Sequence, residues 1–276
     1  MRAWRQARAL LAGSLAAALL AGAAGCAQSV GPIERLGRKA AQKVHRSHRP
    51  GDRAYRRWGL AAPLAPAPRP ARPLLQGAGP ADAGLPPVLD RVPTRDKVVF
   101  LTYDEGAEED PRFVDMVREL RLPVSVFLTD SAVGRGYTRV ARLRAAGAGI
   151  QNHSLGRAPL RGRPYEEQRA AICGQRDRLR SRLGRPPRLL RPPYGRYDRT
   201  TLRAAADCGI TALVLWRPTP GMAPDPYEWG TTPRPGDIIL PHEPGRSPMS
   251  LTVETTRLLR RVQAMGFTVG RLEDYL

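Results

Sequence analysis

The sequence predicts an α/β domain with a parallel sheet, and three observations support this class. Short apolar runs rich in Val, Ile and Leu alternate along residues 96–276 with longer segments of helical composition. The connections between them are short, as in repeated β-then-α units. Several runs are apolar without alternation, which is typical of strands buried on both faces of a parallel sheet. Because about 180 residues are few for eight complete units, we expect an incomplete or distorted barrel.

The first expected strand is the run Val-Val-Phe-Leu, which is followed by two adjacent acids, Asp104 and Glu105, and a glycine. Acids at the end of a buried parallel strand lie where open α/β sheets and barrels place their sites, although such a pair can also cap the next helix. In chain order, the expected strands span residues 98–102, 124–128, 148–151, 211–215, 237–240 and 267–269. The expected helices span residues 111–121, 137–146, 164–183, 198–208 and 250–265.

Residues 1–26 have the composition of an export signal. Arg2, Arg5 and Arg8 precede an apolar stretch at 9–24, and Cys26 follows small residues as in the bacterial lipobox, where the cysteine is lipidated. Signal cleavage near Ala27 without lipidation and an uncleaved anchor are the alternatives. We therefore expect an exported protein, lipid-anchored on the outer face of the cell membrane or secreted.

Residues 27–95 are expected to form a largely disordered linker before a single domain at 96–276. Residues 31–60 are basic and typical of a solvated tail, although they could form a helix on a membrane surface. Residues 61–87 are rich in Ala and Pro, which favours an extended polyproline-like spacer.

The formal net charge is +20, and residues 1–95 hold 16 Lys and Arg against 4 Asp and Glu. The chain has no zinc-finger spacing, no aromatic RNA-binding signature and no basic helix with heptads, which argues against nucleic acid as a partner. An anionic membrane or wall polymer is the expected partner of the basic tail. We expect the domain to be a monomer.

Two cysteines, Cys173 and Cys208, remain in the expected domain. In an oxidising compartment this even pair can form a single disulfide. Two buried free thiols are the alternative, because Cys is a common small core residue.

Four polar clusters fall at expected strand ends. They are Asp104-Glu105-Gly106, Asn152-His153-Ser154, Arg191-Pro192-Pro193-Tyr194-Gly195 and Leu240-Pro241-His242. Their order and spacing resemble the motifs of the polysaccharide deacetylases, carbohydrate esterase family 4. The resemblance covers residues 96–276. It implies a distorted (β/α) barrel of the glycoside hydrolase and deacetylase type that removes acetyl groups from N-acetylated sugars with one divalent metal, usually zinc.

The resemblance also implies roles for individual residues. Asp104 stands at the position of the catalytic base, Arg191 at that of the arginine that orients the base, and His242 at that of the acid that protonates the leaving amine. Such a reaction needs an activated water, stabilisation of the oxyanion and a proton for the departing nitrogen. The implied substrate-binding positions are the backbone N–H of Tyr194, the aromatic wall at Trp216 and the acetyl pocket at Leu240.

The implied metal site departs from the family pattern. His153 matches the first histidine ligand, Glu105 stands where the family has Asp, and Arg157 stands where it has a second histidine. A guanidinium stays protonated and has no lone pair to give to a metal. We therefore hypothesise that Arg157 occupies the volume of the metal and pairs with Glu105 by bidentate contact.

Two functions follow from this pattern. The first is an exported polysaccharide deacetylase-like protein that hydrolyses N-acetyl groups of envelope glycans, of the peptidoglycan type, with a zinc-type divalent metal. The alternative is a catalytically inactive, metal-free carbohydrate-binding pseudoenzyme of the same fold. Retention of Asp104, Arg191 and His242 favours activity, whereas the changes at 105 and 157 favour binding alone.

Overall fold

The computed structural model describes residues 54–74, 84–217, 233–242 and 248–276. The expected signal peptide with Cys26, and the basic segment as far as residue 53, lie outside the described residues. Within the described ranges no helix is both long enough and apolar enough to cross a membrane.

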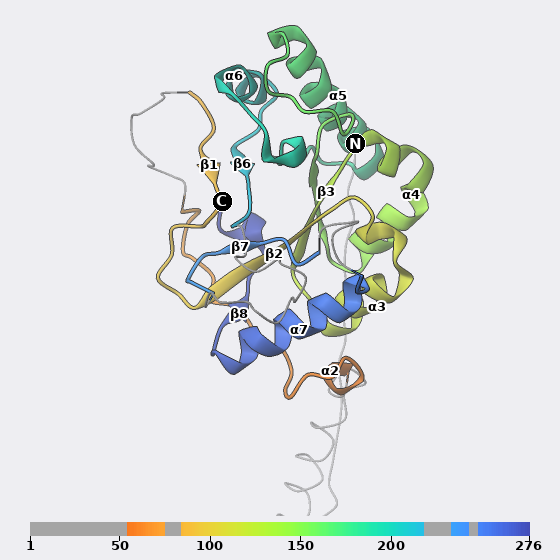
Figure 1. The fold of residues 1–276 in the computed structure, drawn as a ribbon, viewed down its shortest axis with the longest axis vertical. Coiled ribbons are helices and arrows are strands. Elements are labelled where there is room, and N and C mark those ends of the chain that lie inside the picture. The colour runs from red at the N-terminus through yellow and green to blue at the C-terminus, as the bar shows by residue number, and fades with distance from the viewer. Residues whose placement is uncertain (1–53, 75–83, 218–232, 243–247) are drawn as a thin grey trace, which may run out of the picture. The chain divides into compact units, whose positions relative to one another are not determined.

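An eight-stranded parallel sheet forms the centre of the domain (Figure 1). The strands run in the spatial order β1-β6-β5-β4-β3-β2-β7, and β8 pairs with β2. Their bounds are β1 Val88–Leu89, β2 Val98–Asp104, β3 Val124–Leu128, β4 Gly149–Asn152, β5 Leu189–Leu190, β6 Ala212–Val214, β7 Ile238–Ile239 and β8 Thr268–Val269. All residues of β2 except Asp104 are buried, and all of β3 are, as expected for strands covered on both faces.

The sheet is not closed, which confirms the expected incomplete barrel. On one side β2 pairs with β3, and on the other with β7 at its middle and β8 at its beginning. Instead of a continuous ladder between β1 and β7, a single antiparallel bridge joins Arg91 to Asp237. The backbone N–H of Val92 also donates to the carbonyl of Gly236 at 2.8 Å. A short segment after β1 therefore spans the opening.

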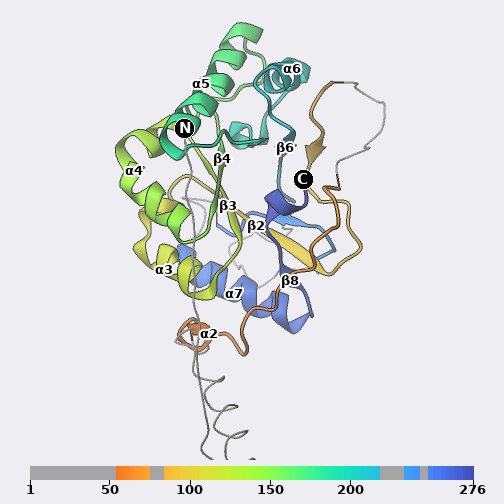
Figure 2. The ribbon, with the colours of Figure 1, turned by 180° about the vertical axis from the view of Figure 1, so that it is seen from behind.

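Helices cover the outside of the sheet (Figure 2). Asp110 caps α3 by accepting from the N–H of Arg112 at 2.8 Å, and Asp198 forms a capping box with Thr201 at the start of α6. The helix bounds are α2 Ala54–Arg57, α3 Pro111–Leu120, α4 Asp130–Ala145, α5 Tyr165–Leu183, α6 Arg199–Asp207 and α7 Leu251–Ala264.

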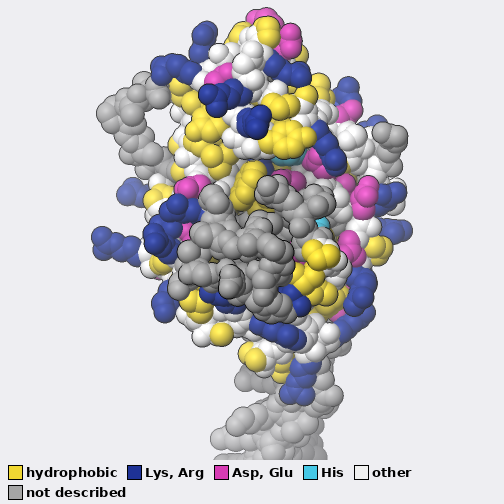
Figure 3. All heavy atoms as spheres, viewed as in Figure 1, with side chains coloured by type: hydrophobic (Ala, Val, Ile, Leu, Met, Phe, Trp, Pro, Cys, Tyr) yellow, Lys and Arg dark blue, Asp and Glu magenta, His cyan; other side chains and the backbone are white. Residues whose placement is uncertain are grey.

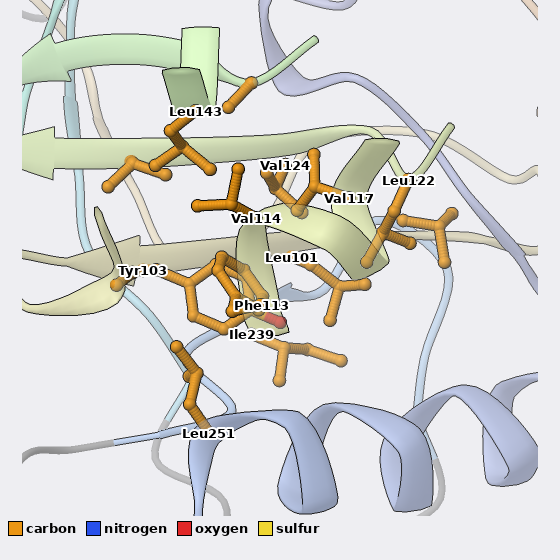
Figure 4. Packing of buried hydrophobic residues seen from close by; sticks show 14 of the residues in the cluster. Leu101, Tyr103, Phe113, Val114, Val117, Leu122, Val124, Leu143, Ile239 and Leu251 are labelled. Carbon is orange, nitrogen blue, oxygen red and sulfur yellow. The ribbon is translucent and has the colours of Figure 1, made fainter. Parts of the chain in front are cut away.

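The largest apolar cluster lies between the sheet, α3 and α7 (Figure 4). Tyr103 from β2 packs against Phe113 from α3, with ring centroids 4.6 Å apart. Leu251 at the start of α7 and Ile239 of β7 belong to the same cluster. This packing fixes β2 and its carboxyl end, which carries the two acids.

Most expected elements are present, and the differences have local causes. Helix α4 begins at Asp130 instead of residue 137, because the N–H of Asp130 donates to the carbonyl of Leu155 at 3.2 Å and tertiary contact offsets the weak helix propensity of Gly134 and Gly136. Strands β1 and β5 have two residues each, too few for a periodic pattern.

The expectation of a linker without packing is wrong for residues 54–74 and 84–95. Trp58 is buried, and its indole N–H donates to Glu119 of α3 at 2.9 Å. Arg260 of α7 donates to the carbonyl of Gly59 at 2.6 Å, and β1 pairs with β6. Isolated apolar residues such as Trp58 and Leu60 carry no periodic signal, although each fills a site on the domain surface.

Candidate active site

The predicted clusters meet at one edge of the sheet because the strands that carry them are parallel and in register. Asp104 pairs with Phe127 of β3, and Asn152 pairs with both Leu128 of β3 and Leu190 of β5. The carboxyl ends of β2, β4 and β5 therefore lie together, and the residues that follow them share one site. On this face, Figure 3 shows small areas of histidine surface near acidic and apolar side chains, with many basic side chains towards its margins.

Asp104 is held by a buried arginine. Arg191 is fully buried, and its Nη1 lies 2.9 Å from Asp104 Oδ1. Its Nη2 donates to Thr102 Oγ1 at 2.7 Å, and its Nε donates to the Val214 carbonyl at 3.3 Å. The guanidinium therefore has a partner on each nitrogen, and it keeps the Asp104 carboxylate oriented as the resemblance implies.

Aromatic rings complete the surroundings of Arg191. The guanidinium carbon lies 4.3 Å from the centroid of Phe127 and 5.2 Å from that of Trp216. Burial lowers the pKa of the Arg191 guanidinium, and the neighbouring Asp104 carboxylate opposes this shift. Cation–π contact and the ion pair both favour the charged form.

The loop after β4 places His153. Its Nδ1 lies 2.7 Å from the carbonyl of Arg191, and because a carbonyl only accepts, Nδ1 carries the proton. Ser154 has a left-handed φ of 70°, and its N–H donates to Asn152 Oδ1 at 2.7 Å. Asn152 in turn donates to the carbonyl of Ile172 in α5 at 2.9 Å. In the neutral imidazole, Nε2 therefore presents a lone pair to the site.

Glu105 faces both His153 and Arg157. Arg157 Nε lies 2.5 Å from Glu105 Oε1, whereas His153 Nε2 lies 3.7 Å from Glu105 Oε2. The Glu105 side chain is 9% exposed and the Arg157 side chain is 68% exposed. The hypothesised pair is present, with two corrections. The contact uses Nε alone and is not bidentate, and the exposed guanidinium lies at the rim instead of filling a buried metal position.

These residues do not fit the three-ligand metal site that the resemblance implies. Glu105 Oε2 is buried without a hydrogen-bond partner, and it faces His153 Nε2, as two ligands of one metal would. At the third ligand position stands Arg157, a cation that binds the same Glu105 carboxylate. In the described part of the chain, no group of three or more His, Cys, Asp or Glu side chains could hold a metal ion. Asn152 is committed to the loop and to α5, and Glu243 lies outside the described residues.

His242 belongs to a third polar pair. Its Nδ1 is hydrogen-bonded to Glu254 Oε2, and the Glu254 side chain is 8% exposed. Glu254 comes from the first turn of α7, so that the packing of α7 on β2 places the carboxylate. Because Glu254 engages Nδ1, the other ring nitrogen, Nε2, remains for a ligand. Among the described residues His242 joins neither of the other pairs directly.

The implied substrate-binding residues surround this edge. Tyr194 is 65% exposed and has a left-handed φ of 59°. Trp216 is partly buried against Arg191 and lies next to Gly195, where an added Cβ would be 3.6 Å from the indole ring. Leu240 is buried directly after β7. The exposed Tyr194, which precedes Gly195 in sequence, and the partly buried Trp216 each offer an apolar face for a sugar ring.

Cys173 and Cys208 form a disulfide between α5 and the end of α6, with Cα atoms 5.0 Å apart. Of the two alternatives left open by the sequence, the structure has the bonded pair. Cys173 lies directly after Ile172, whose carbonyl holds Asn152, so the disulfide braces the helix behind the His153 loop.

Sequence reasoning missed two residues of the site. Glu254 lies three residues after Leu251 and four before Leu258, on the buried side of α7, and an acid on an apolar helix face was the available signal. Thr102 is fully buried within β2, donates to the carbonyl of Ile239 at 2.9 Å and accepts from Arg191. No sequence pattern separates it from an ordinary strand threonine.

Comparison with known proteins identifies relatives of this chain. The sequence profile described as polysaccharide deacetylase matches residues 91–213. An uncharacterized protein of Streptomyces coelicolor is 54% identical, over 71% of this chain and 80% of that protein.

Two solved structures share the fold. A peptidoglycan N-acetylglucosamine deacetylase, Bc1960, has a TM-score of 0.61 at 20% identity, over 68% of this chain and 92% of that one. BA3943, a carbohydrate esterase family 4 pseudoenzyme of Bacillus anthracis, has a TM-score of 0.57 at 18% identity, over 69% of each chain. At these identities the likeness shows the fold.

Proposed function

Because the chain belongs to the polysaccharide deacetylase family, carbohydrate esterase family 4, we propose that it binds N-acetylated glycans of the cell envelope without metal-dependent hydrolysis. One observation carries this proposal, the contact between Arg157 Nε and Glu105 Oε1 at 2.5 Å. The carboxylate that would bind the metal is engaged by a fixed cation, and the residue that would complete the site cannot coordinate.

The glycan-binding part of the proposal is supported by what the site retains. Tyr194, Trp216 and the apolar Leu240 border the edge where Asp104 and His242 lie in their own pairs. These groups can hold a sugar ring and hydrogen-bond an acetamido group without activating a water. The pseudoenzyme BA3943 provides a precedent for a non-catalytic protein with this fold.

Deacetylation is the second candidate, and a different observation favours it. Glu105 Oε2 has no hydrogen-bond partner and faces His153 Nε2, and both catalytic pairs, Asp104 with Arg191 and His242 with Glu254, are formed. If Arg157 released Glu105, two of the expected ligands would remain.

The two functions are separated by measuring acetate release and binding on the same preparation. We expect no acetate from chitotetraose or N-acetylated peptidoglycan with or without added zinc or cobalt, and no difference between the wild type and Asp104→Asn. Isothermal titration with chitotetraose should show binding that Trp216→Ala weakens. Acetate release that requires metal and is lost in Asp104→Asn would establish the enzyme instead.

A second experiment rebuilds the metal site. The double variant Arg157→His, Glu105→Asp should bind one zinc ion per chain in equilibrium dialysis. It gives the site two imidazoles and the shorter aspartate side chain that the family has at this position. The matched control is Arg161→His, Glu105→Asp, which adds a histidine at another exposed arginine. Equal zinc binding by the wild type would overturn the metal-free proposal.

We also propose that the protein is exported and lipidated at Cys26, with the basic segment at 27–53 contacting an anionic membrane or wall polymer. The Cys173–Cys208 disulfide supports an oxidising compartment. Metabolic labelling with palmitate should mark the wild type and not Cys26→Ala. In the Cys26→Ala background, deleting residues 27–53 should release the protein from the envelope fraction, and retention would exclude a role for the basic segment.

A further inference from the structure

A cavity of about 320 Å³ lies at the edge of the sheet opposite the candidate active site. It opens at the amino ends of β4 and β5, where Gly149 and Leu189 line it. Because the strands are parallel, this edge is separated from Asp104 and His153 by the length of the sheet. Four arginines line the cavity: Arg144 near the end of α4, Arg185 and Arg188 between α5 and β5, and Arg271 after β8.

The charge of the lining is strongly unbalanced. Glu273 is the one acidic side chain in it, and its oxygens already accept from Ser125 Oγ at 2.9 and 3.0 Å and from Gln151 Nε2 at 2.9 Å. None of the four arginines forms an ion pair with a described residue. Arg271 donates to the carbonyl of Gly147, which leaves its charge uncompensated. Among the described residues, the lining therefore carries four guanidinium groups against one acidic side chain, that of Glu273.

We propose that this cavity binds a phosphate ester of about the size of glycerol phosphate. Guanidinium groups present paired donors that match phosphate oxygens, and several of them around one concavity select a doubly charged group. The volume lies at the lower end of the range for small-molecule sites, so it accommodates a phosphate with a short polyol. Thr211 adds a hydroxyl to the lining.

A soluble or polymer-borne ester fits this surface better than a bilayer does. The large exposed apolar side chains among the described residues are Tyr137, Tyr194 and Val253, and none of them lines the cavity. A membrane-docking surface would add apolar groups to the basic ones. The proposal is independent of whether the site at the other edge hydrolyses its glycan. Together, the two edges would let one molecule hold a phosphate-bearing wall polymer and an N-acetylated glycan at once.

The test is isothermal titration of the purified full chain with sn-glycerol 3-phosphate, and with inorganic phosphate as the minimal probe. We expect binding, with glycerol phosphate tighter than phosphate. Replacing Arg144, Arg185, Arg188 and Arg271 by Gln should weaken it at least tenfold. The matched control replaces Arg95, Arg112, Arg169 and Arg203 by Gln, four exposed arginines outside the cavity, and should leave the affinity unchanged at the same net charge.

Two further results would overturn the proposal. If both quadruple variants lose affinity equally, the protein attracts phosphate through its net charge and the cavity is not a site. If vesicles of phosphatidylglycerol bind through the same four arginines while glycerol phosphate does not, the surface recognises a membrane. Should the Gln variant not fold, the quadruple Lys variant keeps the charge and removes the guanidinium forks, and it should also bind glycerol phosphate more weakly.

Discussion

Asp104 and Glu105 are adjacent, and each is paired with an arginine, but the two pairs differ in the partner. Arg191 has a side-chain exposure of 0%, whereas Arg157 is 68% exposed. The first arginine has a partner on every nitrogen, and the second contributes Nε alone. Asp104 therefore belongs to a preorganised network, and Glu105 belongs to a pair that solvent reaches from one side.

The difference shows which part of the site the fold itself maintains. Arg191 connects β2, β5 and β6 through Asp104, Thr102 and the Val214 carbonyl, so that its loss would disturb the sheet. Arg157 connects one loop to one carboxylate. Residue 157 can therefore change from metal ligand to cation without disturbing the scaffold, whereas residue 191 cannot.

The largest expected effect comes from Arg191→Met. Removing a buried cation leaves Asp104, Thr102 and a carbonyl without their donor, and we expect the free energy of unfolding to fall by about 3–5 kcal/mol. Urea unfolding followed by tryptophan fluorescence measures it, with Arg161→Met as the exposed control. A loss under about 1 kcal/mol would mean that the network contributes little to the fold.

Arg157→Met should lower the free energy of unfolding by a smaller amount than Arg191→Met, about 2 kcal/mol at most. The guanidinium is already in solvent, and the cost arises because the buried Glu105 carboxylate loses its one close donor among the described residues. The same urea experiment measures it. In the Glu105→Gln background the cost should nearly vanish, because a neutral amide needs no counter-charge. A loss as large as that of Arg191→Met would remove the distinction between the two pairs.

The His242–Glu254 pair resembles the Asp104–Arg191 pair more than the Glu105–Arg157 pair, because both of its side chains are largely shielded from solvent. Glu254→Gln should lower the free energy of unfolding by about 1 kcal/mol, the usual size of one hydrogen bond. It should also shift the tautomer of His242, since Nδ1 loses its carboxylate; ¹⁵N chemical shifts of the imidazole report this directly. Glu273→Gln, at the opposite edge of the sheet, is the control and should leave those shifts unchanged. An unaltered tautomer in Glu254→Gln would show that Glu254 does not position the ring.

The sequence predicts the fold and the order of the site residues because each motif follows a strand, and parallel strands bring their carboxyl ends together. It also predicts the pairing of Arg157 with Glu105, since an arginine in place of a ligand leaves a carboxylate without a counter-charge. The contact through Nε alone and the exposure of the guanidinium depend on the path of the loop after His153, which no local pattern encodes.

The segment at residues 54–74 is a second case in which local sequence patterns do not predict the packing. The sequence predicts a solvated basic tail up to residue 60 and an Ala/Pro-rich spacer from residue 61, whereas Trp58 and Leu60 are buried by contact with helices distant in sequence. Single apolar residues on an extended segment produce no periodicity, so only the assembled surface shows where they pack.

Substitution of Glu108 should have the smallest effect on stability. It reports on the Glu105–Arg157 pair. Burial raises the pKa of its carboxyl above the usual value of 4.5, hydrogen bonds from backbone N–H groups, including that of Gly106, lower it, and the charges of Glu109 and Glu105 raise it further. Because the folded state binds this proton more tightly than the unfolded state, the contribution to stability is complete below pH 4.5 and is lost as the pH rises through the folded-state pKa. Relative to the wild type, Glu108→Gln should therefore become more stable as the pH rises from 4 to 7.

The comparison of the two pairs predicts how this pH dependence changes. Arg157→Met removes the positive charge that faces Glu105, so the pKa of Glu108 should rise further and the gain from Glu108→Gln should increase. Glu109→Gln, at an exposed carboxylate paired with Arg139, is the control and should show little pH dependence in either background. If removing Arg157 left the Glu108 effect unchanged, Arg157 would not be compensating the charge of Glu105 and would not replace the charge of a metal ion.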